Sequence, residues 1–156
     1  MPMRYWGDNM KTVEFIILGE PKGKGRPRVV TRGKFSKAYT PQETIAYENL
    51  IKVEYELQTG RHRFSNGTFL EMRIEAYHSI PKSVSKKRRE MMLSGEIRPI
   101  KKVDADNLIK VVADALIGVS YRDDTQIVTC KCYKYYSDDP CVKVTLKELG
   151  VDPTKE

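Results

Sequence analysis

The chain has 156 residues, with 28 Lys and Arg against 21 Asp and Glu, and its net charge is +7. This length fits one domain with a sizeable core, and a hydrophobic content of 40% excludes a disordered polyelectrolyte. The longest apolar run, residues 15–18, is too short to span a membrane, and residues 1–9 lack a secretory signal. Three cysteines cannot all pair within one chain, so we expect a reducing, cytoplasmic setting.

The positive charge is concentrated in two segments. Residues 22–37 contain seven basic and no acidic side chains, and residues 82–102 contain eight basic side chains against two acidic ones. Most basic runs are merely solvated faces, but such a concentration on an otherwise acidic body favours a surface that follows nucleic-acid phosphates. The predicted DNA-binding residues are Lys22, Lys24, Arg26, Arg28, Arg32, Lys86, Lys87, Arg88, Arg89, Lys101 and Lys102.

The N-terminal part of the chain predicts a strand, a loop and a helix. Residues 13–18 form the strand, and the glycines and prolines of residues 19–37 predict a loop. A helix over residues 40–60 follows, with Thr40 as its cap and Pro41 at its first position. The apolar residues that we expect on its core side are Ile45, Leu50, Ile51 and Leu57.

The middle of the chain predicts one strand and two helices. Residues 69–78 alternate between apolar and polar side chains, which indicates a strand with one buried face. A short basic helix begins at Ser83 or Ser85 and ends near Gly95. Residues 106–116 predict an amphipathic helix whose apolar residues fall within an arc of roughly 140°. These apolar residues are Leu108, Val111, Val112, Ala115 and Leu116.

Two further strands close the chain. Residues 126–136 and 141–148 are expected to form a hairpin whose turn is the polar segment 137–140. Helices and strands are therefore intermixed, which predicts an α+β fold with a mixed β-sheet packed against helices. We expect a single domain over the whole chain, with flexible ends at residues 1–11 and 150–156.

Five aspartates and no glutamate lie between residues 103 and 125. Asp104 and Asp106 flank the start of the second helix, Asp123 and Asp124 lie in the loop after it, and Lys110 lies one turn beyond Asp106. For each aspartate alone, a structural role as a cap, a member of an exposed helix pair or a turn residue is the favoured explanation. Together, carboxylates between two basic segments are typical of a metal-dependent phosphodiesterase, in which a lysine stabilises negative charge at the phosphate.

Three segments of the chain carry a resemblance to a known family. Residues 102–110 (KVDADNLIK), 114–118 (DALIG) and 123–127 (DDTQI) resemble the RusA family of Holliday junction resolvases. The basic segment 21–28 (PKGKGRPR) is similar to the N-terminal loop of phage and prophage members of that family. The resemblance extends over about residues 13–148, which is nearly the whole chain.

The resemblance implies both a site and an activity. It assigns catalysis to Asp104, Asp106, Lys110 and Asp124, and metal binding to the three aspartates, with Asp123 as a further candidate. It implies a homodimer that uses Mg²⁺, or Mn²⁺ in its place. No nucleotide cofactor is expected, because Gly25 is followed by Arg26 and the Gly-Lys-Ser/Thr ending of a phosphate-binding loop is absent. Such an enzyme nicks opposite strands of a four-way DNA junction in recombination and repair.

Two alternatives remain open on the sequence alone. The first is a non-catalytic DNA- or RNA-binding module in which the aspartates only cap helices and shape turns. The second is a flap- or fork-specific nuclease that has the same site but prefers another substrate geometry.

Overall fold

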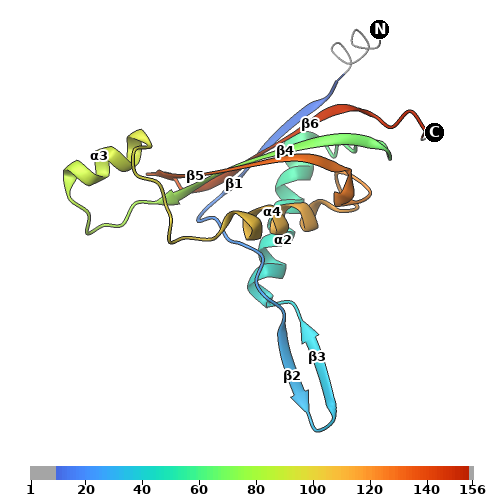
Figure 1. Ribbon diagram of the computed structural model, residues 1–156, viewed down its shortest axis with the longest axis horizontal. Coiled ribbons are helices and arrows are strands. Elements are labelled where there is room, and N and C mark those ends of the chain that lie inside the picture. Colours follow the sequence, from blue (N-terminus) through green and yellow to red (C-terminus); the bar gives the residue numbers. More distant parts are fainter. Residues whose placement is uncertain (1–9, 155–156) are drawn as a thin grey trace.

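The computed structural model describes residues 10–154 as a four-stranded mixed sheet, a separate two-stranded hairpin and helices (Figure 1). This confirms the predicted α+β fold in a single domain. Its elements, in chain order, are β1 (Thr12–Leu18), β2 (Arg28–Arg32), β3 (Phe35–Tyr39), α2 (Gln42–Thr59), β4 (Thr68–Ser79), α3 (Lys86–Ser94), α4 (Ala105–Leu116), the 3₁₀ helix η1 (Asp124–Gln126), β5 (Ile127–Ser137) and β6 (Cys141–Val151).

The strand order of the main sheet is β1-β6-β4-β5. Strand β6 runs antiparallel to both β1 and β4, whereas β5 runs parallel to β4. The expected hairpin between the last two strands is therefore wrong, because β4 lies between them. The side chains of β4 alternate between buried and more exposed over all 12 residues, so this strand fits the centre of the sheet. Turn residues between two strands do not determine which strands pair.

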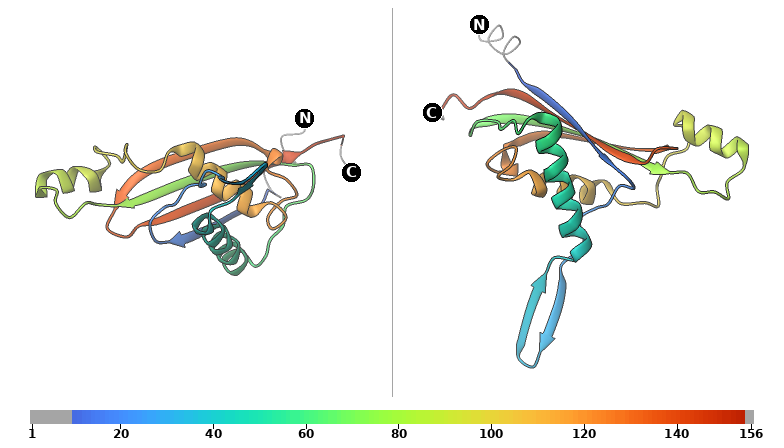
Figure 2. Two further views of the ribbon diagram at one scale, coloured as in Figure 1. Left: turned by 90° about the horizontal axis from the view of Figure 1, so that it is seen from below. Right: turned by 180° about the vertical axis from the view of Figure 1, so that it is seen from behind.

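The hydrophobic core lies between one face of the main sheet and the helices α2 and α4, which both cover that face (Figure 2). Inward-facing residues of the sheet include Phe15, Ile17, Leu70, Met72 and Val144, each at most 1% exposed. All five apolar residues predicted on the core side of α4 are buried. The alternation of β4 and the helical period of α4 were therefore read correctly from the sequence.

Helix α2 differs from its prediction at both its start and its buried face. Pro41, not Thr40, occupies the position before the first helical residue, and no side chain caps the helix there. Of the four predicted core residues only Ile51 is buried, and Leu57 is 75% exposed. Tyrosines replace them, because the ring of Tyr55 packs in the core while its hydroxyl donates a hydrogen bond of 2.6 Å to the carbonyl of His62.

The expected loop over residues 19–37 contains the hairpin of β2 and β3, so this prediction is corrected. Gly33, with φ of 59°, opens a two-residue turn between the strands, in the left-handed conformation that such hairpin turns require. The β-branched run of residues 29–31 before this glycine was the signal for a strand. The alternation of apolar and polar side chains did not distinguish this strand from the surrounding Gly- and Pro-rich loop.

The chain ends extend the main sheet further than expected. Strand β6 continues to Val151, where it pairs with Thr68, so residues 150 and 151 are part of the sheet and not of a flexible end. The backbone of Lys11 accepts a hydrogen bond from the N–H of Glu148. Residues 1–9 and 155–156 of the expected flexible ends lie outside the described residues. No helix within residues 10–154 has the length and apolar character needed to cross a membrane.

Candidate active site and nucleic-acid interface

Three of the four predicted catalytic residues lie on helix α4 or directly before it. Asp104 lies at the position before the first helical residue, Asp106 in the first turn and Lys110 one turn further on, and all three are exposed. The Asp104 side chain does not cap the backbone of the helix and instead accepts a hydrogen bond of 2.6 Å from the amide of Asn107. Since residues four apart are neighbours on a helix, Asp106 and Lys110 lie on the same side of α4.

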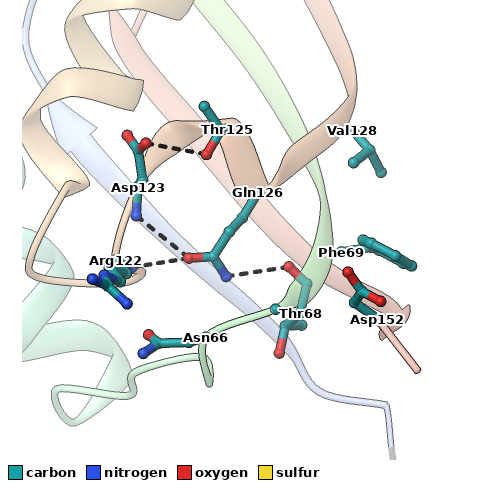
Figure 3. Close-up of a pocket in the computed structure, with 10 residues that line it drawn as sticks. Asn66, Thr68, Phe69, Arg122, Asp123, Thr125, Gln126, Val128 and Asp152 are labelled. Atoms are coloured by element: carbon teal, nitrogen blue, oxygen red, sulfur yellow. Dashed lines mark hydrogen bonds between the residues drawn. The ribbon is translucent and has the colours of Figure 1, made fainter. Parts of the chain in front are cut away.

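The predicted pair Asp123–Asp124 lies in a tight turn at η1, and Figure 3 shows the contacts of the first of the two carboxylates. Asp123 accepts hydrogen bonds from the N–H of Asp124 at 2.9 Å and from the hydroxyl of Thr125 at 3.1 Å. The Gln126 side chain accepts from the N–H of Asp123 and donates to the carbonyl of Thr68, which ties the turn to β4. Asp123 is therefore engaged in building the turn that presents Asp124.

The role of Gln126 in this turn was not predicted from the sequence, although its position three residues after Asp123 indicates it. An acidic residue followed three positions later by Gln is the pattern of a capping box, and Asp123 and Gln126 form one here. The pocket drawn in Figure 3 lies beside this turn and is lined by Asp123, Arg122 and Asp152 among others. Its lining includes neither Asp104 nor Asp106.

Electrostatics connect Asp124 with helix α4. Burial, followed by the neighbouring Asp123 and Asp114, raises the pKa of the Asp124 carboxyl, and the positive charge of Lys110 opposes this rise. The turn at η1 also packs against α4. Asp124, Asp114 and Lys110 thus lie within electrostatic reach of one another, with Asp106 one helical turn from Lys110.

The carboxylates have the right chemistry for a hard cation but do not form a closed cage. Within residues 10–154, no three His, Cys, Asp or Glu side chains gather closely enough to hold a metal ion by themselves. Mg²⁺ in proteins is often held by one or two carboxylates, with waters and substrate phosphate as the other ligands. Exposed oxygen donors on α4 and η1 fit an open site of that kind, in which a DNA phosphate completes the coordination.

The glycine-rich basic loop before β2 packs directly on the start of α4. The N–H of Lys24 donates a hydrogen bond of 2.9 Å to the carbonyl of Asn107. Gly23 approaches so closely that a Cβ atom there would lie 2.4 Å from a methyl carbon of Val103, and one at Gly25 would lie 2.6 Å from the Thr44 hydroxyl. The lack of a side chain at Gly23 therefore lets the loop approach the start of α4, and its lack at Gly25 lets the loop approach the start of α2.

Lys24 differs from the other predicted DNA-binding residues because two carboxylates hold it. Its ammonium lies 2.7 Å from Glu48 on α2 and 3.3 Å from Asp114 on α4, and about a fifth of the side chain is exposed. Burial alone would lower the pKa of Lys24, but the hydrogen bonds and charges of Glu48 and Asp114 outweigh it and raise the pKa. This lysine ties the loop, α2 and α4 together.

The remaining predicted DNA-binding residues lie in four groups, which are the basic loop, β2, α3 and the segment before α4. The loop residues Lys22 and Arg26 line a pocket at the base of the hairpin together with Arg28. On α3, three basic residues are exposed, whereas Arg89 forms an ion pair with Asp138. The exposed residues of the other groups are Arg28 and Arg32 on β2, Lys86, Lys87 and Arg88 on α3, and Lys101 and Lys102 before α4.

Comparison with known proteins identifies the family of this chain. Residues 19–147 match the family described as Endodeoxyribonuclease RusA. The chain is also similar to the uncharacterized protein YqaN of Bacillus subtilis (strain 168), with 35% identity over 146 residues that cover 90% of this chain and 99% of that protein. The matched residues include the basic loop, α4 and the Asp123–Asp124 turn. The chain belongs to the RusA endodeoxyribonuclease family.

Proposed function

We propose that this endodeoxyribonuclease resolves four-way DNA junctions by paired symmetric nicks, depends on Mg²⁺ or Mn²⁺, and acts in recombination and repair. One observation carries the proposal. Asp106 and Lys110 share one exposed side of helix α4, and Asp104 directly precedes its first residue. The 3₁₀ helix η1 adds Asp124 within electrostatic reach of Lys110, and a basic loop packs on the start of α4. Carboxylates next to phosphate-binding cations are what metal-assisted phosphodiester hydrolysis needs.

The proposed roles follow from the charges and positions of the side chains. Asp104, Asp106 and Asp124 would hold the divalent ion, which, when bound, lowers the pKa of a water ligand and offsets negative charge on the phosphate. Lys110 lies exposed between Asp106 and Asp124 and is free to stabilise the charge that develops on the scissile phosphate. Asp123 holds the backbone of the turn and acts on catalysis through the position of Asp124.

A homodimer completes the proposal, because a four-way junction has two-fold symmetry and two strands must be cut. Helix α2 supports this part. Leu50, Val53 and Leu57 are 40%, 51% and 75% exposed, and by helical spacing they share the face opposite to Ile51 and Tyr55 in the core. We expect Leu57→Glu to shift the protein toward monomer in sedimentation equilibrium, while an unchanged mass distribution would argue against this interface.

The test compares an immobile four-way junction, a matched linear duplex and a 5′ flap, each with Mg²⁺ or with EDTA. Wild type runs beside Asp104→Asn, and Asp139→Asn, an exposed acid in the β5–β6 turn, is the matched control. We expect symmetric junction nicks that require metal and Asp104. Asp104→Asn should bind the junction at least as well as wild type, because a negative charge near phosphate is removed.

The other outcomes separate the alternatives. Binding without cutting in Mg²⁺ or Mn²⁺ would favour the non-catalytic binding module. Preferential cutting of the flap would favour a flap or fork nuclease. An Asp104→Asn protein that cuts fully but binds more weakly would contradict the assignment of Asp104 as a metal ligand.

A further inference from the structure

The hairpin of β2 and β3 projects from the body of the molecule, and its tip lies far from the main sheet (Figures 1 and 2). Every one of its ten strand residues is exposed. A two-stranded hairpin on its own is marginally stable, and it contributes nothing to the hydrophobic core. Its sequence therefore reflects a use other than supporting the fold.

The two faces of this hairpin have opposite character. Side chains alternate along each strand, so the directly paired residues of β2 and β3 share a face. On one face the pairs are Arg28 with Tyr39, Val30 with Lys37, and Arg32 with Phe35. On the other face the pairs are Val29 with Ala38 and Thr31 with Ser36.

Local contacts confirm this division. Val30, Arg32, Phe35, Lys37 and Tyr39 together line one shallow pocket. The hydroxyls of Thr31 and Ser36 lie 3.1 Å apart, as a hydrogen-bonded pair on the opposite face. All the cations and aromatic rings of the two strands are thus gathered on one face, whereas the reverse face is small and uncharged.

The basic and aromatic face continues toward the predicted active site. Arg28 belongs to this face and also lines the pocket at the base of the hairpin, together with Lys22, Arg26 and Val103. Val103 directly precedes Asp104, the first of the predicted metal ligands. A single cationic path therefore leads from the start of α4 to the tip of the hairpin.

The tip carries the most exposed aromatic residue of this face. Phe35 follows the Gly33 turn and is 82% exposed. A base that has lost its pairing partner offers a flat apolar surface for such a ring, and base–aromatic stacking tolerates any sequence. Aromatic side chains alternating with cations are characteristic of surfaces that hold unpaired nucleic-acid strands.

We propose that this face of the hairpin binds DNA beside the branch point of the junction, with Arg28, Arg32 and Lys37 on phosphates and Phe35 stacked on an unpaired base. A two-stranded β-ribbon is narrow enough to follow a groove of the duplex arm. The proposal rests on the proposed function and identifies the element that engages the branched part of its substrate. It also adds Phe35, Lys37 and Tyr39 to the predicted interface.

Charge argues for DNA over a second copy of this chain as the occupant. Residues 22–37 contain no acidic side chain, so a symmetric pairing of two hairpin faces would bring three cations against three identical cations. DNA phosphates instead complement every charge on this face.

Binding measurements test the two kinds of contact separately. They use full-length protein with Asp104→Asn, so that the junction is not cut. Phe35→Ala should weaken junction binding about fivefold or more, with a smaller effect on linear duplex, because base pairs at the branch point open more readily than those inside a continuous duplex. Arg32→Gln with Lys37→Gln should weaken both, and should reduce the slope of log affinity against log salt by about one for each lost contact. Val29→Ala, on the reverse face, is the matched control.

A photo-crosslink identifies the occupant even if a variant hairpin loses its structure. The otherwise unchanged protein with p-benzoylphenylalanine in place of Phe35 should crosslink to a junction strand near the branch point. The protein with the same residue in place of Val29 should crosslink far less. Crosslinking of Phe35 to a second protein chain would overturn the proposal, as would equal junction affinities for Phe35→Ala and Val29→Ala. Wild type that nicks junctions in spite of such results leaves the proposed function intact. Wild type that binds no DNA overturns both.

Discussion

Lys24→Met is expected to destabilise the fold more than it weakens DNA binding. Removing one partner of a buried ion pair costs about 3–5 kcal/mol, and removing an exposed partner costs about 0–1 kcal/mol. The side chains of Lys24, Glu48 and Asp114 are 20%, 16% and 24% exposed, so they lie between these limits. Without the ammonium the two carboxylates also repel each other. We expect a loss of about 2 kcal/mol in the free energy of unfolding.

Urea unfolding at neutral pH measures this loss directly. For a protein of this size, about 2 kcal/mol corresponds to a decrease of about 4–8 °C in melting temperature. Glu48→Gln, alone and combined with Lys24→Met, completes a double-mutant cycle, and the combined variant should lose less than the sum of the two single changes. Lys22→Met is the matched control, because Lys22 is exposed in the same loop and should affect junction affinity instead.

The pH dependence has a definite sign. Because the Lys24 pKa is raised above 10.5, the stability from the ion pairs is present below that pH and is lost as the pH rises through the folded-state pKa. Wild type and Lys24→Met should therefore differ equally at pH 7 and pH 9 and should converge above about pH 10.5. A Lys24→Met protein within about 0.5 kcal/mol of wild type, with greatly weakened junction binding, would refute this reasoning and restore Lys24 to the DNA interface.

Three further variants test other parts of the structure. Tyr121→Phe removes a buried hydroxyl that donates 2.6 Å to the carbonyl of Ala113, and it should cost about 1–2 kcal/mol in urea unfolding, whereas no loss would mean that the carbonyl finds another donor. Burial lowers the pKa of His78, so its stabilising effect is complete above about pH 6.5 and declines as the pH falls through the lower folded-state pKa. His78→Gln should flatten the stability profile between pH 7.5 and pH 5, and parallel profiles would contradict this. Gly23→Ala places a Cβ 2.4 Å from Val103, so junction nicking should fall several-fold, and an unchanged rate would show that the loop need not contact α4.

The local patterns of the sequence were sufficient for the elements with a complete buried face. Strand β4 and helix α4 each present an uninterrupted apolar period, and the structure buries the predicted side of both. The motif residues on α4 and η1 were sufficient to predict the family, which the match over residues 19–147 confirms. Hydrophobic periodicity depends on residues that are close together in the chain, so it can be recognised in the sequence without knowledge of the fold.

Local sequence patterns did not predict the buried face of α2 or the β2–β3 hairpin. On α2, Tyr47 and Tyr55 take the core positions, whereas Leu57 is exposed. Tyr55 buries its ring while its hydroxyl donates a hydrogen bond to the carbonyl of His62. The β2–β3 hairpin escaped prediction since both its faces are exposed and it has no buried period. In such elements the composition of each face matters more than hydrophobic alternation.

Only the tertiary structure decided which charges are free and which strands are neighbours. Lys24 belongs by sequence to a basic loop, yet it is held by Glu48 and Asp114, which lie 24 and 90 residues away in the chain. Asp123 and Asp124 are adjacent and chemically identical, yet their side chains differ in their partners. Asp123 accepts hydrogen bonds within the turn, whereas Asp124 interacts electrostatically with Lys110. Strand β4 likewise separates two strands that are joined by a short turn. These outcomes depend on contacts between distant residues, which residue spacing along the chain does not encode.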